Sequence, residues 1–87
     1  MKKIIVTVTD NKHFKYELEL PAEVVLLDMY GELAYTINKA NEAHKIVCPT
    51  IRKYELYSKR NKSYLNMGET FQQAKVYTGD TIVIQAE

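Results

Sequence analysis

The sequence is poor in the residues that stabilise a fold covalently or through a metal ion. Its 87 residues include one cysteine, two histidines and no tryptophan. Cys48 has no partner for an internal disulfide, and one thiol with two scattered histidines cannot form the usual closed zinc site. We therefore expect no disulfide and no metal, and a stability that comes from packing alone.

Long apolar runs are also missing. A membrane-spanning helix needs roughly 18 consecutive apolar residues, whereas the run after the N-terminal lysines, Ile4–Val8, is short and contains a threonine. No small-residue cleavage site follows it, so we do not expect a signal peptide. With a single cysteine, the chain is expected to be cytoplasmic and not to insert into a membrane.

Neither charge nor composition singles out a partner. Twelve basic residues against eleven acidic ones give a net charge of +1, so no global field steers the chain towards nucleic acid. Hydrophobic residues make up 46% and charged residues 26% of the chain, which is typical of a globular protein. A second core would leave each half too short, so residues 1–87 are expected to form a single domain.

Two strands are predicted near the N-terminus. Residues 4–9 are strand-favouring types and end at Asp10-Asn11-Lys12, which favours a turn. Residues 14–20 alternate apolar side chains with Lys or Glu, the pattern of a half-buried strand. The two strands should pair as a hairpin, and Pro21 should end the second because it has no N–H to donate.

From about Val24 to Asn41 the spacing becomes helical. Apolar residues recur there at i, i+3 and i+4: Leu26, Met29, Tyr30, Leu33 and Ile37. Gly31 costs such a helix roughly 1 kcal/mol relative to alanine. We expect this glycine to mark a close approach of the helix to the sheet.

Shorter elements follow the helix. A connector over 44–50 should lead to a strand over 51–58, a turn over 59–62, a brief strand at 64–65, a single helical turn over 70–74, a tight turn over 78–80 and a strand over 81–84. A right-handed crossover through the helix places the last strand parallel to the first. This order predicts an α+β fold of the β-grasp type, with a mixed sheet of four to five strands packed on one helix.

Three groups of residues point to a known family. They are Leu65, Gly68, Thr70 and Phe71, which have the spacing of two core positions around a turn in ubiquitin; Leu20-Pro21-Ala22-Glu23 with the helix positions Leu26, Met29 and Leu33; and Tyr77-Thr78-Gly79-Asp80-Thr81-Ile82. Over nearly its whole length the chain resembles the small ubiquitin-like proteins of Gram-positive type VII secretion systems, the EsaB/YukD family. The resemblance implies a cytoplasmic accessory or regulatory protein that binds protein partners of the secretion machinery.

The end of the chain departs from ubiquitin. Ubiquitin and the sulfur-carrier β-grasp proteins finish in Gly-Gly, which threads an activated carboxylate into a narrow active site. This chain ends Ile84-Gln85-Ala86-Glu87. We therefore expect neither conjugation nor sulfur transfer.

Residues suited to catalysis are isolated from one another. Cys48 has only His44 nearby in sequence as a general base, and His13 lies in the first predicted turn. Asp28 and Glu32 belong to the exposed face that every amphipathic helix presents. No glycine-rich phosphate loop or Ser/His/Asp set is present, so we expect no enzyme, no catalytic residue and no cofactor.

One candidate interaction site lies on the sheet face away from the helix. If the neighbours of Ile5 and Val83 point inward, strand period two places these two side chains outward. With Tyr57 nearby, they would form a small apolar patch that binds a protein partner.

The alternative site is the basic segment 45–62. It holds six basic residues against one acidic residue, a net charge of +5, and basic residues interleaved with tyrosines are typical of single-stranded nucleic-acid platforms. The patch would consist of Lys53, Lys59, Arg60 and Lys62. We favour the protein interface over nucleic-acid binding. The residues leave open a homo-oligomer, or a structural subunit that pairs through a sheet edge.

Overall fold

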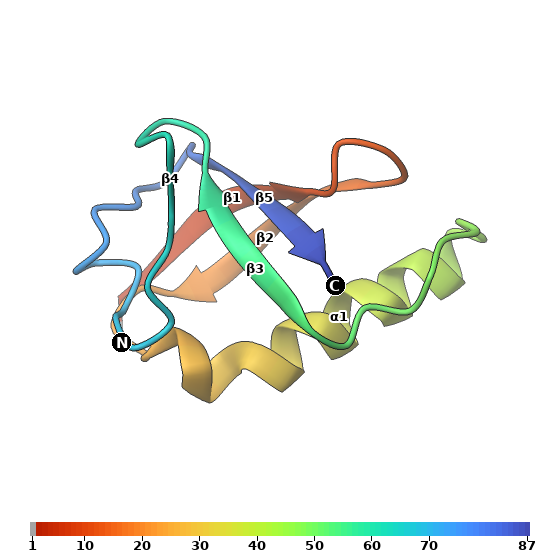
Figure 1. Ribbon diagram of the computed structural model, residues 1–87, viewed down its shortest axis with the longest axis horizontal. Coiled ribbons are helices and arrows are strands. Elements are labelled where there is room, and N and C mark those ends of the chain that lie inside the picture. Colours follow the sequence, from red (N-terminus) through yellow and green to blue (C-terminus); the bar gives the residue numbers. More distant parts are fainter. Residues whose placement is uncertain (1) are drawn as a thin grey trace.

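The computed structural model describes residues 2–87. The strands are β1 (Lys3–Thr9), β2 (Lys15–Pro21), β3 (Tyr54–Ser58), β4 (Ser63–Tyr64) and β5 (Thr81–Ala86), and the helices are a 3₁₀ turn, η1 (Leu26–Met29), and α1 (Tyr30–Ala43). The strands form one sheet in the order β2-β1-β5-β3-β4. β5 runs parallel to β1, and the other neighbours are antiparallel. The predicted α+β β-grasp architecture is confirmed (Figure 1).

The helix packs against one face of this sheet. Strand period two turns alternate side chains of β1, β5 and β3 towards the helix, and the helical spacing does the same for Leu26, Met29, Leu33 and Ile37. The buried core consists of Ile4, Val6, Val8, Phe14, Ala22, Leu26, Met29, Leu33, Ala34, Ile37, Ile51, Tyr54, Leu56, Phe71, Val76, Ile82 and Ile84. The apolar helix face predicted from spacing is therefore the core face.

The helix begins later than its spacing predicts. Val24 and Val25 precede it, and η1 then makes one tight turn before α1 starts at Tyr30. The N–H groups of Leu26 and Leu27 donate to the carbonyls of Glu69 and Met67, both at 2.9 Å. These donors are bound by a distant loop, which holds the start of the helix against the segment before Phe71.

The expectation for Gly31 is wrong. This residue is exposed in the first turn of α1, and a Cβ built there meets no atom within 4 Å. The glycine therefore does not mark a close approach to the sheet. At its other end, α1 continues two residues past the predicted boundary, to Ala43.

The connector between α1 and β3 runs back along the helix (Figure 1) and is held by helix side chains. The Asn38 side-chain amide donates to the carbonyl of Ile51, and its oxygen accepts from the Ile51 N–H, both at 2.9 Å. Asn41 accepts a hydrogen bond from the Tyr16 hydroxyl at 2.5 Å and donates to the Cys48 sulfur at 3.2 Å. Because Ile51 bonds to a side chain rather than to a strand, β3 begins at Tyr54, three residues later than predicted.

Two tyrosines join the start of α1 to the start of β3. The Tyr54 N–H donates to the Tyr30 hydroxyl at 2.6 Å, and that hydroxyl donates to the Tyr54 carbonyl at 3.1 Å. The Tyr54 hydroxyl in turn donates to the Tyr30 carbonyl at 2.7 Å, and the rings stack with centroids 4.2 Å apart. Burial, with a smaller contribution from Tyr30, raises the pKa of the Tyr54 hydroxyl.

The segment between β4 and β5 is a series of turns. The predicted helical turn over 70–74 closes with a hydrogen bond from the Ala74 N–H to the Thr70 carbonyl at 3.0 Å. It does not continue as a helix, because Lys75 takes a left-handed backbone conformation with φ of 59°. Phe71 and Val76 anchor this segment in the core.

Truncating the helix face should destabilise the protein strongly. Leu33 is 3% exposed between α1 and the sheet, so Leu33→Ala should lower the free energy of unfolding by about 2 to 5 kcal/mol. The control, Tyr35→Ala, removes a side chain from the outer helix face that is 63% exposed, and it should change that free energy by less than about 0.5 kcal/mol. Urea titration measures both values, and equal effects would contradict the assigned helix face.

Removing the Asn38 side chain should loosen the connector. Asn38→Ala leaves the N–H and carbonyl of the buried Ile51 without their partners, which should cost about 1 to 3 kcal/mol of unfolding free energy. Amide hydrogen exchange should accelerate over residues 46–53 more than in β1. Lys39→Ala, on the next residue of α1, is the control and should leave exchange in the connector unchanged.

Candidate protein-interaction surface

A row of side chains crosses the outer face of the sheet, the face away from α1. In the strand register, Val83 lies opposite Thr9 on one side and Tyr57 on the other, and Tyr57 lies opposite Tyr64. Directly paired residues on one face of a sheet are in contact distance of each other. The row therefore passes from β1 through β5 and β3 to β4 and ends in two aromatic rings.

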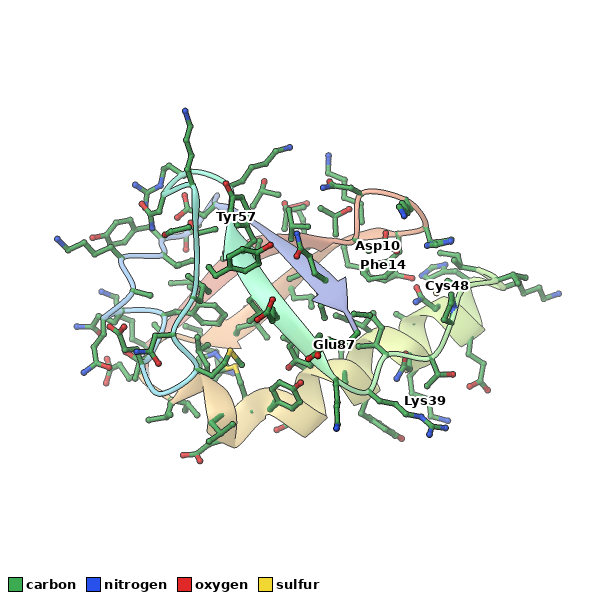
Figure 2. All side chains as sticks on the ribbon, in the orientation of Figure 1. Asp10, Phe14, Lys39, Cys48, Tyr57 and Glu87 are labelled. Atoms are coloured by element: carbon green, nitrogen blue, oxygen red, sulfur yellow. The ribbon has the colours of Figure 1, made fainter. Side chains whose placement is uncertain are left out.

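The two rings and one amide form what we call the tyrosine patch: Tyr57, Tyr64 and Gln85. The Tyr57 and Tyr64 rings meet edge to face with centroids 5.2 Å apart. The Tyr64 hydroxyl donates to the Gln85 side-chain oxygen at 2.7 Å. Tyr64 is 53% exposed, and Figure 2 shows Tyr57 at the end of β3 nearest β4, remote from the helix. The patch presents an aromatic surface that its own contacts hold in place.

Val83 is not part of an exposed surface, contrary to expectation. Its side chain is on the outer face, as period two predicts, but it is only 5% exposed because it lies between Thr9 and Tyr57. A polar residue at this position would be buried between those neighbours. Val83 lies beside Tyr57 in the sheet and presents almost no surface to a partner.

Ile5 is exposed but lies apart from Tyr57 and Val83. Its side chain is 45% exposed, and its backbone bonds to Thr78 and Gly79 rather than to the middle of β5. Val83 is opposite Thr9, four residues further along β1, which corresponds to about 13 Å at the usual strand rise. The three predicted residues therefore do not form one patch.

The basic residues are also separated. Lys53 precedes β3, whereas Lys59 and Lys62 follow it in the turn to β4, so the two ends lie about 20 Å apart along an extended strand. Lys59 and Lys62 are exposed. The four predicted residues do not form a continuous basic patch.

Arg60 is engaged in a structural ion pair. Its Nε and Nη2 donate to the two carboxylate oxygens of Asp80 at 2.9 and 3.0 Å, and Nη2 also donates to the Lys75 carbonyl at 2.5 Å. The guanidinium lies over the Tyr77 ring, 5.2 Å from its centroid. Asp80 is 9% exposed and also accepts from the Tyr77 N–H at 2.9 Å. Hydrogen bonding by Arg60 lowers the pKa of Asp80, against the effect of burial.

A hollow of about 510 Å³ lies at the hairpin end of the molecule, between the 10–14 turn, the connector at Cys48 and the end of β5 (Figure 2). Burial alone would raise the pKa of Asp10. Hydrogen bonds from the N–H groups of Lys12, His13 and Phe14 and from the His13 ring outweigh burial and lower it from 3.8 to about 2. This carboxylate closes the turn, so it is unsuited to act as a general base.

The residues considered for chemistry are not assembled into a site. Cys48 bonds to Asn41, and the His44 ring stacks on Tyr16 with centroids 6.0 Å apart. Within residues 2–87, no group of three or more His, Cys, Asp or Glu side chains is placed to hold a metal ion. Over the same residues, no helix is long and apolar enough to cross a membrane.

The sequence predicts Tyr57 as an interaction residue, which stays a prediction, and it did not point to Gln85, whose side chain accepts from the Tyr64 hydroxyl. The signal was present: Gln85 is two residues beyond Val83 and therefore on the same face. Tyr64 was recognisable as an aromatic residue in a short strand. Its pairing with Tyr57 depends on the turn between β3 and β4, where Lys62 has a φ of 55°.

This geometry defines a ubiquitin-like domain, and comparison with solved structures agrees. The whole chain aligns with 97% of a ubiquitin-like domain of EccD5 from Mycobacterium xenopi, with a TM-score of 0.82 and 14% identity. It aligns over 99% of its length with all of the ubiquitin-like domain of the type VII secretion protein ECCD1 from Mycobacterium tuberculosis, with a TM-score of 0.77 and 16% identity. No family model and no curated protein matches the chain.

Two further structures show how widely the fold occurs. The chain aligns with 21% of one chain in an ESX-5 inner membrane complex, with a TM-score of 0.80 and 16% identity. It also aligns with 79% of a ubiquitin-like domain of the Arabidopsis thaliana protein At2g32350, with a TM-score of 0.64 and 17% identity. At these identities the comparisons define the fold, which bacteria and a plant share.

Breaking the Arg60–Asp80 ion pair tests whether Arg60 stabilises the fold. Arg60→Gln leaves the buried Asp80 carboxylate without its bidentate partner, so the urea midpoint of unfolding should fall. Lys62→Gln, in the same turn, should leave that midpoint unchanged. With the arginine gone, the pKa of Asp80 should rise, and carboxyl NMR titration would detect this. An unchanged Asp80 titration would contradict the structural assignment.

Proposed function

We propose that this protein is a non-enzymatic, ubiquitin-like protein-interaction module that serves as a cytoplasmic accessory or regulatory component of a Gram-positive type VII secretion system, as EsaB/YukD proteins do. The observation that carries the proposal is the alignment of the whole chain with nearly complete ubiquitin-like domains of two type VII secretion proteins. The sequence resemblance to EsaB/YukD proteins supports the same setting.

The tyrosine patch is suited to bind a protein partner. Tyrosine rings supply a large contact area at a small entropic cost, and their hydroxyls add directional hydrogen bonds. Tyr64 is held by Tyr57 and Gln85, so little ordering is needed on binding. We infer that a partner covers this patch, and that Ile5 contributes only if the interface extends along β1.

Nucleic-acid binding is the weaker alternative. It would rely on Lys59 and Lys62 at one end of β3 and Lys53 at the other, with Arg60 already paired to Asp80. A single-stranded ligand needs a basic groove that follows its backbone. The separation of these residues favours the protein interface.

The experiment is binding of the labelled protein to the purified type VII inner-membrane complex of its source organism. Tyr64→Ala removes an exposed ring of the patch, and we expect it to weaken binding by at least about tenfold. Tyr35→Ala is the matched control: it removes a tyrosine of similar exposure from α1 and should leave binding unchanged.

Three results would contradict the proposal. Absence of binding by the unmodified protein would remove the secretion setting, and loss of binding only in Tyr35→Ala would move the interface to the helix. A salt-sensitive complex with single-stranded RNA that is lost in Lys59→Glu, but not in Tyr64→Ala, would favour the nucleic-acid alternative.

A further inference from the structure

The outermost strand on the hairpin side, β2, has a free edge. β2 pairs with β1 over seven residues, and within residues 2–87 no strand pairs with its other side. The edge at the opposite end of the sheet, β4, has only two residues. β2 is therefore the long edge of this sheet on which a further strand could form.

The register shows which backbone groups point away from the sheet. The Ala22 N–H donates to the Lys2 carbonyl at 2.9 Å, so the bonds to β1 fall on the even-numbered residues of β2. In an antiparallel ladder the intervening residues direct their N–H and carbonyl groups to the other side. Lys15, Glu17 and Glu19 thus present three donors and three acceptors, and Pro21, which has no N–H, is also on this outward set.

A hollow between β2 and α1 accompanies the free edge. Its volume is about 360 Å³, and its lining includes Leu18, Leu20, Met29, Leu33 and Thr36. Leu18 and Leu20 are only half-buried. Alternate side chains of an added strand would point into this hollow, where apolar groups would cover the exposed parts of the two leucines.

The charges along this edge favour a basic occupant. Glu17 and Glu19 are exposed on the outer face of β2, and Glu32 lines the hollow on the helix side. Two lysines oppose these three carboxylates: Lys15 is exposed at the hairpin end of the strand, and Lys3 lines the hollow. Lys3 is 3.5 Å from Glu19, but both side chains are more than half exposed, so this pair is weak and easily replaced. The side chains of an added strand that point to the outer face would meet these carboxylates.

A second copy of the chain is a poorer occupant than a basic peptide. Two β2 strands that pair antiparallel over their full length place Glu17 opposite Glu19 twice, and like charges directly opposite each other destabilise a sheet. Shifted registers avoid this only by shortening the ladder.

We infer that the β2 edge is a second docking site, which takes an extended segment of a partner protein with basic residues alternating with apolar ones, by strand addition. The lysine or arginine side chains face Glu17 and Glu19, and the apolar side chains enter the hollow beside α1. This site lies at the β2 edge of the sheet, whereas the tyrosine patch lies near the opposite edge, which is formed by β4. One domain can therefore hold two partners at once, and the inference does not depend on the secretion setting.

The test uses a synthetic peptide, with both ends blocked, of alternating lysine and valine over seven residues. In NMR titration of the isotope-labelled full chain, the amide signals of Lys15, Glu17 and Glu19 should shift saturably, and their hydrogen exchange should slow. Affinity should fall as sodium chloride is added. The same peptide with glutamate in place of lysine should bind at least about tenfold more weakly.

Variants separate the edge from the rest of the surface. Glu17→Lys with Glu19→Lys should weaken the lysine peptide at least about tenfold and strengthen the glutamate peptide. Glu55→Lys, an exposed glutamate on β3, is the matched control and should change neither affinity. Glu17→Pro removes one outward N–H and none of the bonds to β1, so it should also weaken binding. If Glu17→Pro fails to fold, the charge variants still show whether the peptide binds at the β2 edge.

Four outcomes would overturn the inference. They are equal affinity for the two peptides, signal shifts that centre on Tyr57 and Tyr64, no saturable shift at millimolar peptide, and a dimer that protects β2 and excludes the peptide. Tyr64→Ala should bind the peptide normally. If the peptide does not bind at the β2 edge, the proposal for the tyrosine patch still stands. If the protein does not bind the secretion complex, the proposal for the β2 edge still stands.

Discussion

The position of β3 depends on hydrogen bonds from polar side chains of α1. Within residues 2–87, the connector before β3 pairs with no strand, and buried backbone groups without a partner are costly. Asn38 supplies both bonds that Ile51 needs, and Tyr30 does the same for Tyr54. β3 then lies between β5 and β4 and carries Tyr57 to the outer face. The candidate interface thus depends on contacts made on the opposite side of the sheet.

Ion pairing and burial remove some of the predicted residues from the surface that a partner could contact. Asp80 pairs with Arg60, one of the cations of the basic segment, and Val83 is buried between Tyr57 and Thr9. On the outer face near β4, the accessible surface is the tyrosine patch. At the other edge, β2 carries Glu17 and Glu19 besides Lys15, and within residues 2–87 no strand pairs with its outer side. The near-zero net charge of the chain conceals this difference between its two edges.

Much of the fold was predictable because it follows from local patterns. The alternation over residues 14–20 and the turn at Asp10-Asn11-Lys12 predict the first hairpin, and the helical spacing predicts the core face of α1. Two of the boundaries that were wrong, the start of α1 and the start of β3, are places where a distant segment supplies the hydrogen bonds. Glu69 and Met67 bind the first donors of the helix, and Asn38 replaces a strand partner for Ile51.

The sequence by itself determined the order of elements, the face on which each strand residue lies and the resemblance to ubiquitin-like proteins, because these follow from periodicity and from spacing along the chain. Tertiary structure decided which residues are accessible. Val83 is on the predicted face but is buried by Tyr57 and Thr9, which lie 26 and 74 residues away in sequence. The exposure of a side chain depends on its neighbours in space, and pairing between strands that are distant in sequence determines those neighbours.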